Sequence, residues 1–513
     1  MEIQKQVFSK TLETHFKFPD FRKGQLEVIE AILSKKDVLA VMPTSAGKSL
    51  CYQFPSVYLK KLVIVISPLI SLMNDQVRSL KEMGIKSGCL HSGLTLNEQK
   101  NVFKELNESI GYLLYLSPER AYNDGFTRWI KEKDIALFAI DEAHCVSQWG
   151  HDFRPEYSKL RFLKEIRPDV PVMALTASAT PFVLNDISNC LGLKTPERIV
   201  KGFYRPNLYY QVVDCSGEDH KLKYIRSGIE AHPEGRIIIY CSKRADTEKL
   251  GETLSRYYEG VGIYHAGLST LERTQTQKSY SEGTLRILCA TNAFGMGIDQ
   301  SDVRLVVHYS FPKNIESLYQ EMGRAGRDGK ESTCLVLYDT ADKGLQVFFI
   351  KKSEAKEEIK KAQWRNLDHL IAYCETDECR HGEILTYFKD PQRMKKCGHC
   401  DSCDPQSKRK VRVTKVLVMP TVTVPSKKKV RKEKSTALTG LQEFAFAELR
   451  TWRKEKADSL DLPAFCIFSN QTLMDVARKN PKTKSELLNI KGIGPTKVEQ
   501  FGEELLFVLK HAR

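Results

Sequence analysis

The feature that most constrains the fold is a short apolar run that ends in a loop of small residues. Residues 39–49 read LAVMPTSAGKS. A buried strand that leads through such a loop into a helix presents backbone N–H groups and the positive end of the helix dipole to an anion. These residues therefore predict a strand, loop and helix that bind the phosphates of a nucleotide. An ordinary strand-to-helix turn has the same outline, so the rest of the chain must decide.

The predicted loop assigns a role to each of its polar residues. Lys48 is expected to meet the β and γ phosphates, and the Ser49 hydroxyl is expected to contact Mg²⁺. The usual pattern has glycine six residues before the lysine, where this chain has Met42. The residues predicted to bind phosphate are Thr44, Ser45, Ala46, Gly47, Lys48 and Ser49.

Length and composition limit the class of protein. A chain of 513 residues is too long for one hydrophobic core and predicts about three or four domains. A content of 41% hydrophobic and 28% charged residues is typical of a globular protein. No apolar run approaches the roughly 18 residues that span a bilayer, and the N-terminus does not resemble a signal peptide. We therefore expect a protein that works inside the cell without a membrane partner.

Apolar runs alternate with amphipathic helical segments after the loop. The runs at 62–67, 113–117, 136–141 and 172–177 each end in a polar cluster. This alternation predicts an α/β fold with a parallel sheet, whose functional residues lie at the strand ends. Asp141 and Glu142 lie at the end of the third run. They are expected to hold Mg²⁺ and to orient or deprotonate the attacking water, although paired acids at a strand end often only cap a helix.

A second α/β unit begins near Arg205 and has no phosphate loop of its own. Its predicted strands lie at 236–241, 260–267, 286–291 and 305–310. It also contains the segment YQEMGRAGRDG, in which Arg324 and Arg327 are three residues apart. Arginines that face the first lobe across a cleft can complete its nucleotide site and neutralise charge on the transferring phosphoryl group.

Two further groups of residues suggest binding sites. Before the phosphate loop, Phe18 could stack on a base and the Gln25 amide could pair with the adenine edge, although aromatic residues there also suit a core. Later in the chain, four cysteines have the spacing of a tetrahedral zinc site; they are Cys379, Cys397, Cys400 and Cys403. A disulfide is disfavoured in a reducing compartment, and catalytic thiols would not need four cysteines. His399 and Cys374 are spare candidates.

The C-terminal part begins with a basic stretch. Residues 405–436 have eleven Lys or Arg and one acid, which is a charge of +10 out of +15 for the chain. We expect a linker that could also bind DNA phosphates, and PSKKKVRKEK has the composition of a nuclear import signal. From residue 437 the chain is predicted to be helical, and the loop 491–494 either contacts phosphate or only connects two helices.

Several motifs in order resemble a superfamily 2 helicase: PTSAGKS, SPLISLMNDQ, DEAH, LTASAT, ATNAFGMGID and QEMGRAGRDG. The stretch CVSQWGHDFRPEY (145–157) resembles the aromatic-rich loop of the RecQ family, FRKGQ (21–25) resembles its adenine-reading motif, and the C-terminal part resembles the helicase-and-RNase-D C-terminal (HRDC) domain. The resemblance implies that Arg22 and Gln25 bind adenine and that Arg327 is the arginine finger, with Arg324 beside it. It also implies that Trp149, Phe153 and Arg154 couple single-strand contact to hydrolysis.

The resemblance implies two RecA-like parallel-sheet lobes, a zinc-binding helical subdomain and an all-α HRDC-like domain. The expected domains are lobe 1 at 1–204, lobe 2 at 205–345, the zinc-binding subdomain at 346–404, the basic linker at 405–436 and the HRDC-like domain at 437–513. Longer family members have a winged helix after the zinc site, whose hairpin parts the duplex. Residues 405–436 are too few to form one.

The expected function is that of an ATP-dependent 3′–5′ DNA helicase in DNA repair, recombination and replication, with ATP, Mg²⁺ and Zn²⁺. The expected partners are single-stranded and partly duplex DNA, with single-strand-binding protein or other repair factors as further candidates, and we expect a monomer. In a bacterium it would be cytoplasmic and nucleoid-associated; a nuclear location is the alternative. The competing hypotheses are a DNA-stimulated translocase or strand-annealing factor, a non-enzymatic scaffold and an RNA helicase.

Overall fold

The fold was analysed in a computed structural model of the chain. It describes residues 2–150, 152–295, 300–413, 440–460, 464–468, 470–490 and 492–511. The chain divides into two units, Met1–Ile359 with Thr376–Thr414 and Lys360–Glu375 with Lys415–Arg513.

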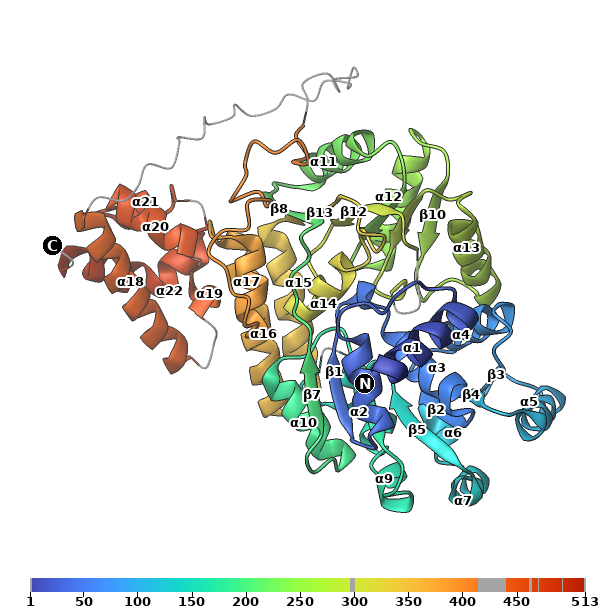
Figure 1. The fold of residues 1–513 in the computed structure, drawn as a ribbon. Helices are drawn as coiled ribbons and strands as arrows, with labels where there is room; N and C mark the ends of the chain where they lie inside the picture. The colour runs from blue at the N-terminus through green and yellow to red at the C-terminus, as the bar shows by residue number, and fades with distance from the viewer. Residues whose placement is uncertain are drawn as a thin grey trace. The chain divides into compact units, whose positions relative to one another are not determined.

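Lobe 1 is built on a seven-stranded parallel sheet with the strand order β3-β4-β2-β5-β6-β1-β7 (Figure 1). The strands are β1 (Val38–Val41), β2 (Leu62–Ile66), β3 (Ser87–Leu90), β4 (Tyr112–Leu116), β5 (Ile135–Ile140), β6 (Val172–Thr176) and β7 (Glu197–Val200). The central strands are buried on both faces, which is why they read as continuous apolar runs. The strands β5, β6 and β1 are consecutive neighbours in this order. Their ends carry the acid pair, the LTASAT motif and the predicted phosphate loop, respectively.

Helices cover both faces of this sheet. They are α1 (Glu2–Thr11), the π-helix η1 (Leu12–Phe16), α2 (Gln25–Leu33), the 3-10 helix η2 (Thr44–Ala46), α3 (Lys48–Leu59), α4 (Ile70–Glu82), α5 (Leu96–Glu108), α6 (Pro118–Ala121), α7 (Asp124–Glu132), the 3-10 helix η3 (Ala143–Val146), α8 (Pro155–Ser158), α9 (Phe162–Ile166) and α10 (Pro181–Leu191). Phe8, Phe54 and Val65 belong to the core between the N-terminal helices and the sheet. The N-terminal segment is therefore part of lobe 1.

Lobe 2 has a six-stranded parallel sheet with the order β10-β11-β9-β12-β13-β8. Its strands are β8 (Leu208–Asp214), β9 (Arg236–Tyr240), β10 (Val261–Tyr264), β11 (Ile287–Ala290), β12 (Val303–His308) and β13 (Ser332–Tyr338). Its helices are α11 (Glu218–Ala231), α12 (Arg244–Ser255), α13 (Thr270–Glu282), α14 (Ile315–Met322) and α15 (Thr340–Lys352). The predicted pair of parallel α/β lobes is confirmed.

Two helices follow lobe 2: α16 (Glu357–Glu375) and α17 (Arg380–Tyr387). Residues 360–375 of α16 fall in the second unit, whereas α17 and the cysteine-containing turn after it fall in the first. The chain beyond the cysteines continues along lobe 2. Val411 exchanges two hydrogen bonds with the Gln211 side chain, each 2.9 Å long, and is buried in the lobe 2 core. Residues 414–439, most of the predicted linker, lie outside the described residues.

The C-terminal helices are α18 (Gly440–Ser459), α19 (Ala464–Ile467), α20 (Asn470–Lys479), α21 (Lys484–Leu487) and α22 (Pro495–His511). They enclose their own apolar core, which includes Leu449, Phe468 and Leu505. The predicted helical C-terminal domain is confirmed. Lys491, in the loop 491–494, lies outside the described residues.

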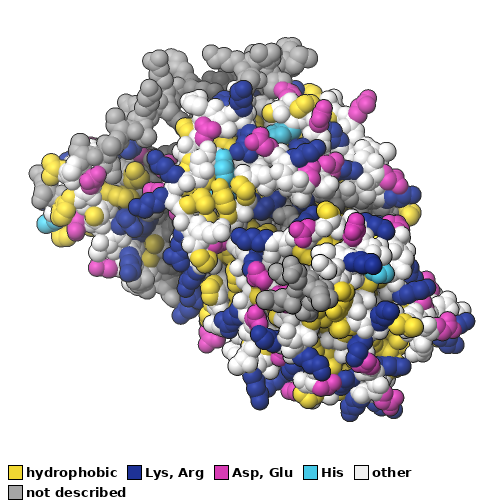
Figure 2. Space-filling view, in the orientation of Figure 1, with side chains coloured by type: hydrophobic (Ala, Val, Ile, Leu, Met, Phe, Trp, Pro, Cys, Tyr) yellow, Lys and Arg dark blue, Asp and Glu magenta, His cyan; other side chains and the backbone are white. Residues whose placement is uncertain are grey.

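The surface has no uniformly basic face in the view of Figure 2. Lys and Arg side chains are interspersed there with Asp and Glu side chains. Among the described residues, no helix is both long enough and apolar enough to cross a bilayer.

Candidate active site

The predicted phosphate loop lies between β1 and α3. Gly47 precedes the first residue of α3, Lys48, and has a φ of 69°. A Cβ at Gly47 would lie 2.8 Å from Gln25 Nε2, so glycine is required both by the backbone conformation and by space. The first N–H groups of α3 therefore lie at the loop, as in phosphate sites at helix N-termini. The Ser45 side chain lies outside the described residues.

Met42 occupies the position where the usual loop begins with glycine. Its N–H donates to Thr176 O over 3.0 Å, and its sulfur lies 4.0 Å from Cys51 Sγ in the core of lobe 1. The Met42 side chain is thus buried beneath the loop. The departure from the usual pattern thus adds a side chain to the core of lobe 1.

The acid pair follows β5 directly. Asp141 continues this strand, because its N–H donates to Ile66 O over 2.9 Å, and its Oδ1 accepts the Glu142 N–H at 3.0 Å. Burial and the neighbouring Glu142 raise the pKa of the Asp141 carboxyl to about 7, although Lys48 opposes the shift. Glu142 has a φ of 48°, in the left-handed region that non-glycine residues rarely adopt. Such local strain is common at functional sites.

His144 links the acid pair to the end of β6. Its Nδ1 lies 3.0 Å from Thr176 Oγ1 and 3.3 Å from Glu142 Oε2, and the Thr176 hydroxyl also accepts the Ser178 N–H at 3.3 Å. Burial lowers the pKa of His144 to about 3, and Lys48 adds to the shift. The imidazole is therefore neutral. No local pattern in the sequence marks this contact, because Thr176 is 32 residues away from His144.

The residues predicted to bind adenine lie next to the phosphate loop. Gln25 is buried; its Oε1 accepts the Arg22 N–H at 2.8 Å, and its Nε2 donates to Ala46 O and Gly47 O at 3.0 and 2.9 Å. Both ends of the amide thus bind protein in this structure. Phe18 is 43% exposed. The structure brings Gln25 to the loop and leaves the face of Phe18 accessible.

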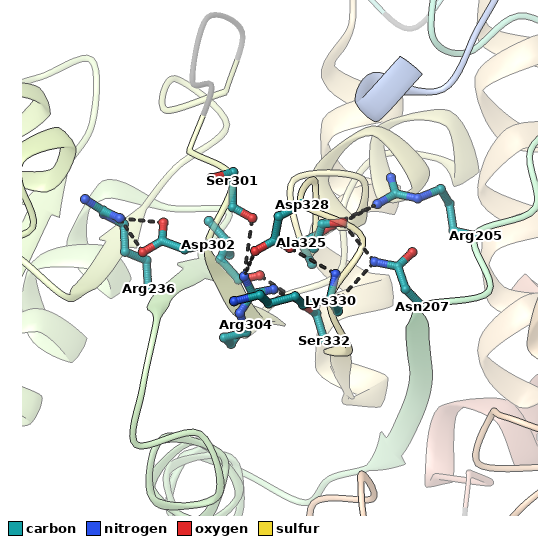
Figure 3. A network of polar contacts seen from close by, with 12 residues as sticks. Arg205, Asn207, Arg236, Ser301, Asp302, Arg304, Ala325, Asp328, Lys330 and Ser332 are labelled. Atoms are coloured by element: carbon teal, nitrogen blue, oxygen red, sulfur yellow. Dashed lines mark hydrogen bonds and ion pairs between the residues drawn. The ribbon is translucent and has the colours of Figure 1, made fainter. Parts of the chain in front are cut away.

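The two arginines of lobe 2 differ in their surroundings. Arg324 is 4% exposed and lies beside the Tyr240 hydroxyl inside lobe 2, whereas Arg327 is partly exposed. Figure 3 shows the loop 323–330 held from both sides: Arg205 and Asn207 bind its carbonyl oxygens, and Arg304 binds Asp328. Arg324 is therefore enclosed in lobe 2, whereas part of Arg327 reaches the surface.

Lobe 1 and lobe 2 contact each other at this loop and also between the helices α13 and α4. Thr44 Oγ1 donates a hydrogen bond of 2.8 Å to Gly323 O, and the Gln277 Nε2 of α13 lies 3.3 Å from Asp75 Oδ2 of α4. A Cβ at residue 323 would lie 2.6 Å from Thr44 Oγ1, so glycine permits the approach. The phosphate loop of lobe 1 and the arginine-containing loop of lobe 2 (323–330) are thus joined by a hydrogen bond.

The loop after the acid pair contains the residues predicted to couple DNA contact to hydrolysis. Arg154 Nη1 donates to Pro68 O over 2.7 Å, in the segment SPLISL, and the Arg154 N–H donates to Cys145 O over 3.0 Å. Trp149 and Phe153 are partly exposed. The loop is therefore anchored at Arg154 while two aromatic side chains remain accessible.

Helix α10 supports the same loop. Ser147 Oγ donates to Asp186 Oδ2 over 2.6 Å, and the Trp149 ring packs edge-on against Phe182, with a centroid distance of 5.7 Å. Phe182 is 61% exposed. Phe182 was not predicted as a site residue, although its position just after LTASAT, at the start of a helix, was a usable signal.

The four cysteines lie together, with their sulfur atoms all within 4.8 Å of one another. A tetrahedral zinc–thiolate site has sulfur atoms about 3.8 Å apart, so the set fits zinc. Three backbone N–H groups donate to these sulfurs, namely Gly382 to Cys379, His399 to Cys397 and Cys403 to Cys400, at 3.3 to 3.4 Å. Hydrogen bonds from Cys397 and Cys400 lower the pKa of the Cys379 thiol to about 3. The same contact with Cys379 raises the pKa of the Cys397 thiol, so the neighbouring sulfurs share a proton that a bound metal would displace.

The cysteine-containing turn is attached to the edge strand β8. The Asp401 N–H donates to Tyr210 O over 3.0 Å, and Asp401 Oδ2 accepts the Val212 N–H at 2.8 Å. Arg380 of α17 pairs with Asp401 at 2.9 Å. His399, a spare candidate for the metal, contacts the Tyr204 hydroxyl through Nε2 at 2.8 Å and also lies close enough to Cys397 and His381 to form a second possible ligand group. The zinc-binding turn thus positions α17 against lobe 2.

Four family matches divide the chain in the same way. The DEAD/DEAH box helicase family matches residues 22–187, the helicase conserved C-terminal domain 220–329, the RecQ zinc-binding family 340–404 and the HRDC domain 442–509. The first two ranges fall within lobe 1 and lobe 2, the third runs from α15 through the cysteine region, and the fourth falls within the C-terminal helices.

Full-length relatives show the same family. The chain is 34% identical to the ATP-dependent DNA helicase RecQ of Pasteurella multocida, an alignment that covers 99% of this chain and 94% of the relative. It is 35% identical to the ATP-dependent DNA helicase RecQ of Bacillus subtilis, over 96% of this chain and 97% of the relative. The first alignment runs over 599 positions against 513 residues here, so that relative has segments with no counterpart in this chain.

Solved structures share the two-lobed fold. Mycobacterium smegmatis helicase Lhr bound to single-stranded DNA and AMP-PNP has a TM-score of 0.53 at 19% identity and covers 67% of this chain and 49% of its own. Saccharomyces cerevisiae Dbp5 bound to RNA has a TM-score of 0.52 at 17% identity and covers 70% of this chain and 96% of its own. These distant structures support the fold only. The family matches, the full-length relatives and the bonded phosphate and arginine loops together show that this chain belongs to the RecQ family of ATP-dependent DNA helicases.

Proposed function

We propose that this chain couples ATP hydrolysis between its two lobes to 3′–5′ movement along single-stranded DNA and to duplex separation, in DNA repair, recombination and replication. The observation that carries the proposal is the Thr44–Gly323 hydrogen bond of 2.8 Å, which joins the phosphate loop to the loop that carries Arg327. A nucleotide at the phosphate loop would therefore touch both lobes, and its hydrolysis would change how they fit together.

Each residue of the site has a chemical role in this proposal. Lys48 binds the outer phosphates, and Arg327 neutralises charge that develops on the transferring phosphoryl group. Glu142 orients the attacking water and accepts its proton. Ser49 and Asp141 would hold Mg²⁺, which supplies charge neutralisation at the phosphates. Asp141 fits this role because it is a buried carboxylate with Lys48 nearby and no acidic partner other than Glu142 in the described surroundings.

The DNA contact is proposed to lie at the loop after the acid pair. Aromatic side chains bind single strands with little sequence preference because every base has a stackable face. Trp149 and Phe153 provide such faces, and the loop between them and Glu142 is short. Movement of this loop on DNA binding would therefore reach Glu142 and His144.

Replacing Trp149 by alanine is expected to lower single-strand-stimulated ATP hydrolysis by about tenfold, because one stacked base contributes roughly 1–3 kcal/mol. Hydrolysis without DNA should stay within about twofold of the parent, since the contacts of Trp149 among the described residues are with Ser147 and Phe182 and not with the acid pair. The measurement is the rate of ATP hydrolysis against oligonucleotide concentration. Trp129→Ala is the matched control, because Trp129 packs on Phe126 and Phe103 in another part of lobe 1. Unchanged DNA stimulation in Trp149→Ala would remove this residue from the DNA contact.

The raised pKa of Asp141 predicts a pH dependence for metal binding. Below pH 7 the carboxyl is mostly protonated and cannot bind Mg²⁺, so the Mg²⁺ affinity of the nucleotide complex is expected to rise roughly tenfold between pH 6 and pH 8. Mg²⁺ titrations at both pH values measure it. The nucleotide phosphates also take up a proton in this range and therefore contribute a pH dependence of their own. Asp141→Asn is the control, because its amide does not titrate and leaves only the contribution of the nucleotide. An equal pH dependence in the variant would show that Asp141 does not contribute.

Whether the chain acts on DNA or on RNA is tested by comparing its ATP hydrolysis in the presence of single-stranded DNA and of RNA of the same sequence. We expect stimulation by DNA. Stimulation by RNA alone would favour the RNA helicase hypothesis, and no hydrolysis with either would favour a non-enzymatic scaffold. A DNA-stimulated translocase or strand-annealing factor remains the second candidate, because residues 405–436 are too few for a winged helix.

A further inference from the structure

The segment that connects the lobes ends in an arginine whose side chain enters lobe 2. Arg205 is 5% exposed, and its guanidinium binds three carbonyl oxygens of the loop 323–330. Nη2 donates to Ala325 O at 3.0 Å and to Gly326 O at 3.1 Å, and Nη1 donates to Gly323 O at 3.4 Å. Figure 3 shows this side chain reaching the loop from one side. All three carbonyl oxygens belong to residues 323–326, which lie immediately before Arg327 in the chain.

We propose that Arg205 is a positioning residue for Arg327, which holds the arginine-containing loop at the nucleotide and ties it to the connection between the lobes. The proposal rests on the proposed function, in which Arg327 contacts the transferring phosphoryl group. Arg205 itself does not touch the nucleotide in this account. It acts through the backbone of residues 323–326.

The chemistry of the contact favours arginine. A planar guanidinium has several donors in a fixed fork, so one side chain can bind three carbonyl oxygens at once, whereas a lysine ammonium cannot span them in the same way. Within the part of the chain that the structure describes, no carboxylate forms an ion pair with Arg205. A buried cation without an ion-pair partner costs stability. This cost supports the view that Arg205 fixes the conformation of the loop 323–330.

The backbone of Arg205 is fixed by the residues before it. The Phe203 ring stacks on Phe388, which follows α17, with a centroid distance of 4.1 Å, and the Phe203 N–H donates to Asp390 Oδ2 over 2.6 Å. Phe203 O accepts the Tyr319 hydroxyl of α14 at 3.1 Å. The connecting segment is thus anchored next to the cysteine region and to the helix that precedes the loop. Arg205 therefore reaches the loop from a defined position.

The same loop carbonyl also receives a bond from lobe 1. Gly323 O accepts Thr44 Oγ1 at 2.8 Å in addition to Arg205 Nη1. One peptide group is therefore shared by the phosphate loop, the connecting segment and the arginine-containing loop. A shift of the phosphate loop would be transmitted to the position of Arg327 through this peptide and through Arg205.

Asn207 provides a second contact of the same kind. Its Nδ2 donates to Gly326 O and to Lys330 O at 2.8 and 3.0 Å, so it shares the Gly326 carbonyl with Arg205 and extends the contact to the end of the loop. Asn207 is partly exposed, and its replacement leaves no buried charge. It offers an independent variant should Arg205 be needed for folding.

The test is a double-mutant cycle in the full chain with single-stranded DNA present. Arg205→Lys keeps the charge and removes the fork, and we expect kcat to fall about 10- to 100-fold, because a small misplacement of a catalytic group has effects of this size. KM for ATP should change by less than about threefold. In an Arg327→Ala background the same change should have no further effect on kcat, because Arg205 acts only through Arg327. Asn207→Ala should show the same pattern with a smaller effect.

Arg236→Lys is the matched control. Arg236 also holds two carbonyl oxygens, those of Tyr280 and Ser281, and pairs with Asp302 in lobe 2, but it does not touch the loop 323–330 (Figure 3). Its replacement should leave kcat within about twofold of the parent. Equal melting temperatures of the variants would exclude a general loss of structure.

The outcomes separate this inference from the proposed function. Normal hydrolysis by Arg327→Ala would overturn the role of Arg327 and with it the basis of the inference. Slow hydrolysis by Arg327→Ala together with normal kcat in Arg205→Lys and Asn207→Ala would overturn the inference alone. Additive losses in the double variant would also overturn it, because Arg205 would then act independently of Arg327.

Discussion

Replacing Lys48 by alanine is expected to lower kcat for ATP hydrolysis by at least ~10²-fold, because the loop loses the cation that meets the developing charge. Single-stranded DNA affinity should stay within about twofold, since the proposed DNA contact lies in the loop around Trp149. The measurements are steady-state ATP hydrolysis with saturating DNA and fluorescence anisotropy of a labelled oligonucleotide.

Lys36→Ala is the control for this experiment. Lys36 is an exposed lysine of lobe 1 that pairs with Glu197 at 2.9 Å, and surface pairs of this kind contribute little. It should hydrolyse ATP like the parent. If Lys48→Ala also retained its turnover, the nucleotide site would have to lie elsewhere in the chain.

Replacing Cys400 by serine is expected to lower the melting temperature strongly or to give insoluble protein. Structural zinc contributes about 10–16 kcal/mol in small zinc-binding peptides, which is as large as the whole stability of a typical domain. Cys400 is fully buried, and the adjacent Asp401 attaches the turn to β8. A strong chelator should have the same effect on the parent protein. The measurements are thermal melting and the zinc content per chain.

Two variants keep this prediction testable. Cys403→Ser changes a less buried member of the cluster and should lower both zinc content and melting temperature if Cys400→Ser is insoluble. Cys190→Ser changes a partly buried cysteine of α10 outside the cluster and should alter neither. An unchanged melting curve for Cys403→Ser or for chelated parent protein would show that the cluster is not structural.

The sequence predicted the central strands well because they are buried on both faces. The runs at 62–67 and 236–241 correspond to β2 and β9, within one residue at their ends. The edge strands β3 and β7 were not predicted, since SGCL and ERIV lack a continuous apolar run. The strand β13 has the same apolar signal as its neighbours and was predictable from it.

The candidate site was predictable where a motif is local. The phosphate loop, the acid pair and the cysteine spacing are short patterns whose geometry follows from one strand end or one turn. The contacts of Arg205 and His144 join residues that are far apart in the sequence, so no local pattern marks them. The Gln25 amide shows the same limit: its residue type suits adenine, and its hydrogen bonds in this structure are to the phosphate loop.

The connection between the cysteine region and α18 is short, which limits how this chain could separate a DNA duplex. Residues 405–413 continue along lobe 2, where Tyr209 donates through its hydroxyl to Asp404 O over 2.9 Å and Val411 joins the core. Fewer than thirty residues then lead to α18. A winged helix does not fit into this length, so we expect a different element to separate the duplex if the chain unwinds DNA.

The central claim is tested most directly by unwinding of a duplex with a single-stranded 3′ tail, measured beside ATP hydrolysis on the same preparation. The account predicts ATP-dependent separation of the 3′-tailed duplex and little separation of the matched 5′-tailed duplex. DNA-stimulated hydrolysis without separation of either substrate would contradict it and would identify the chain as a translocase that does not part strands.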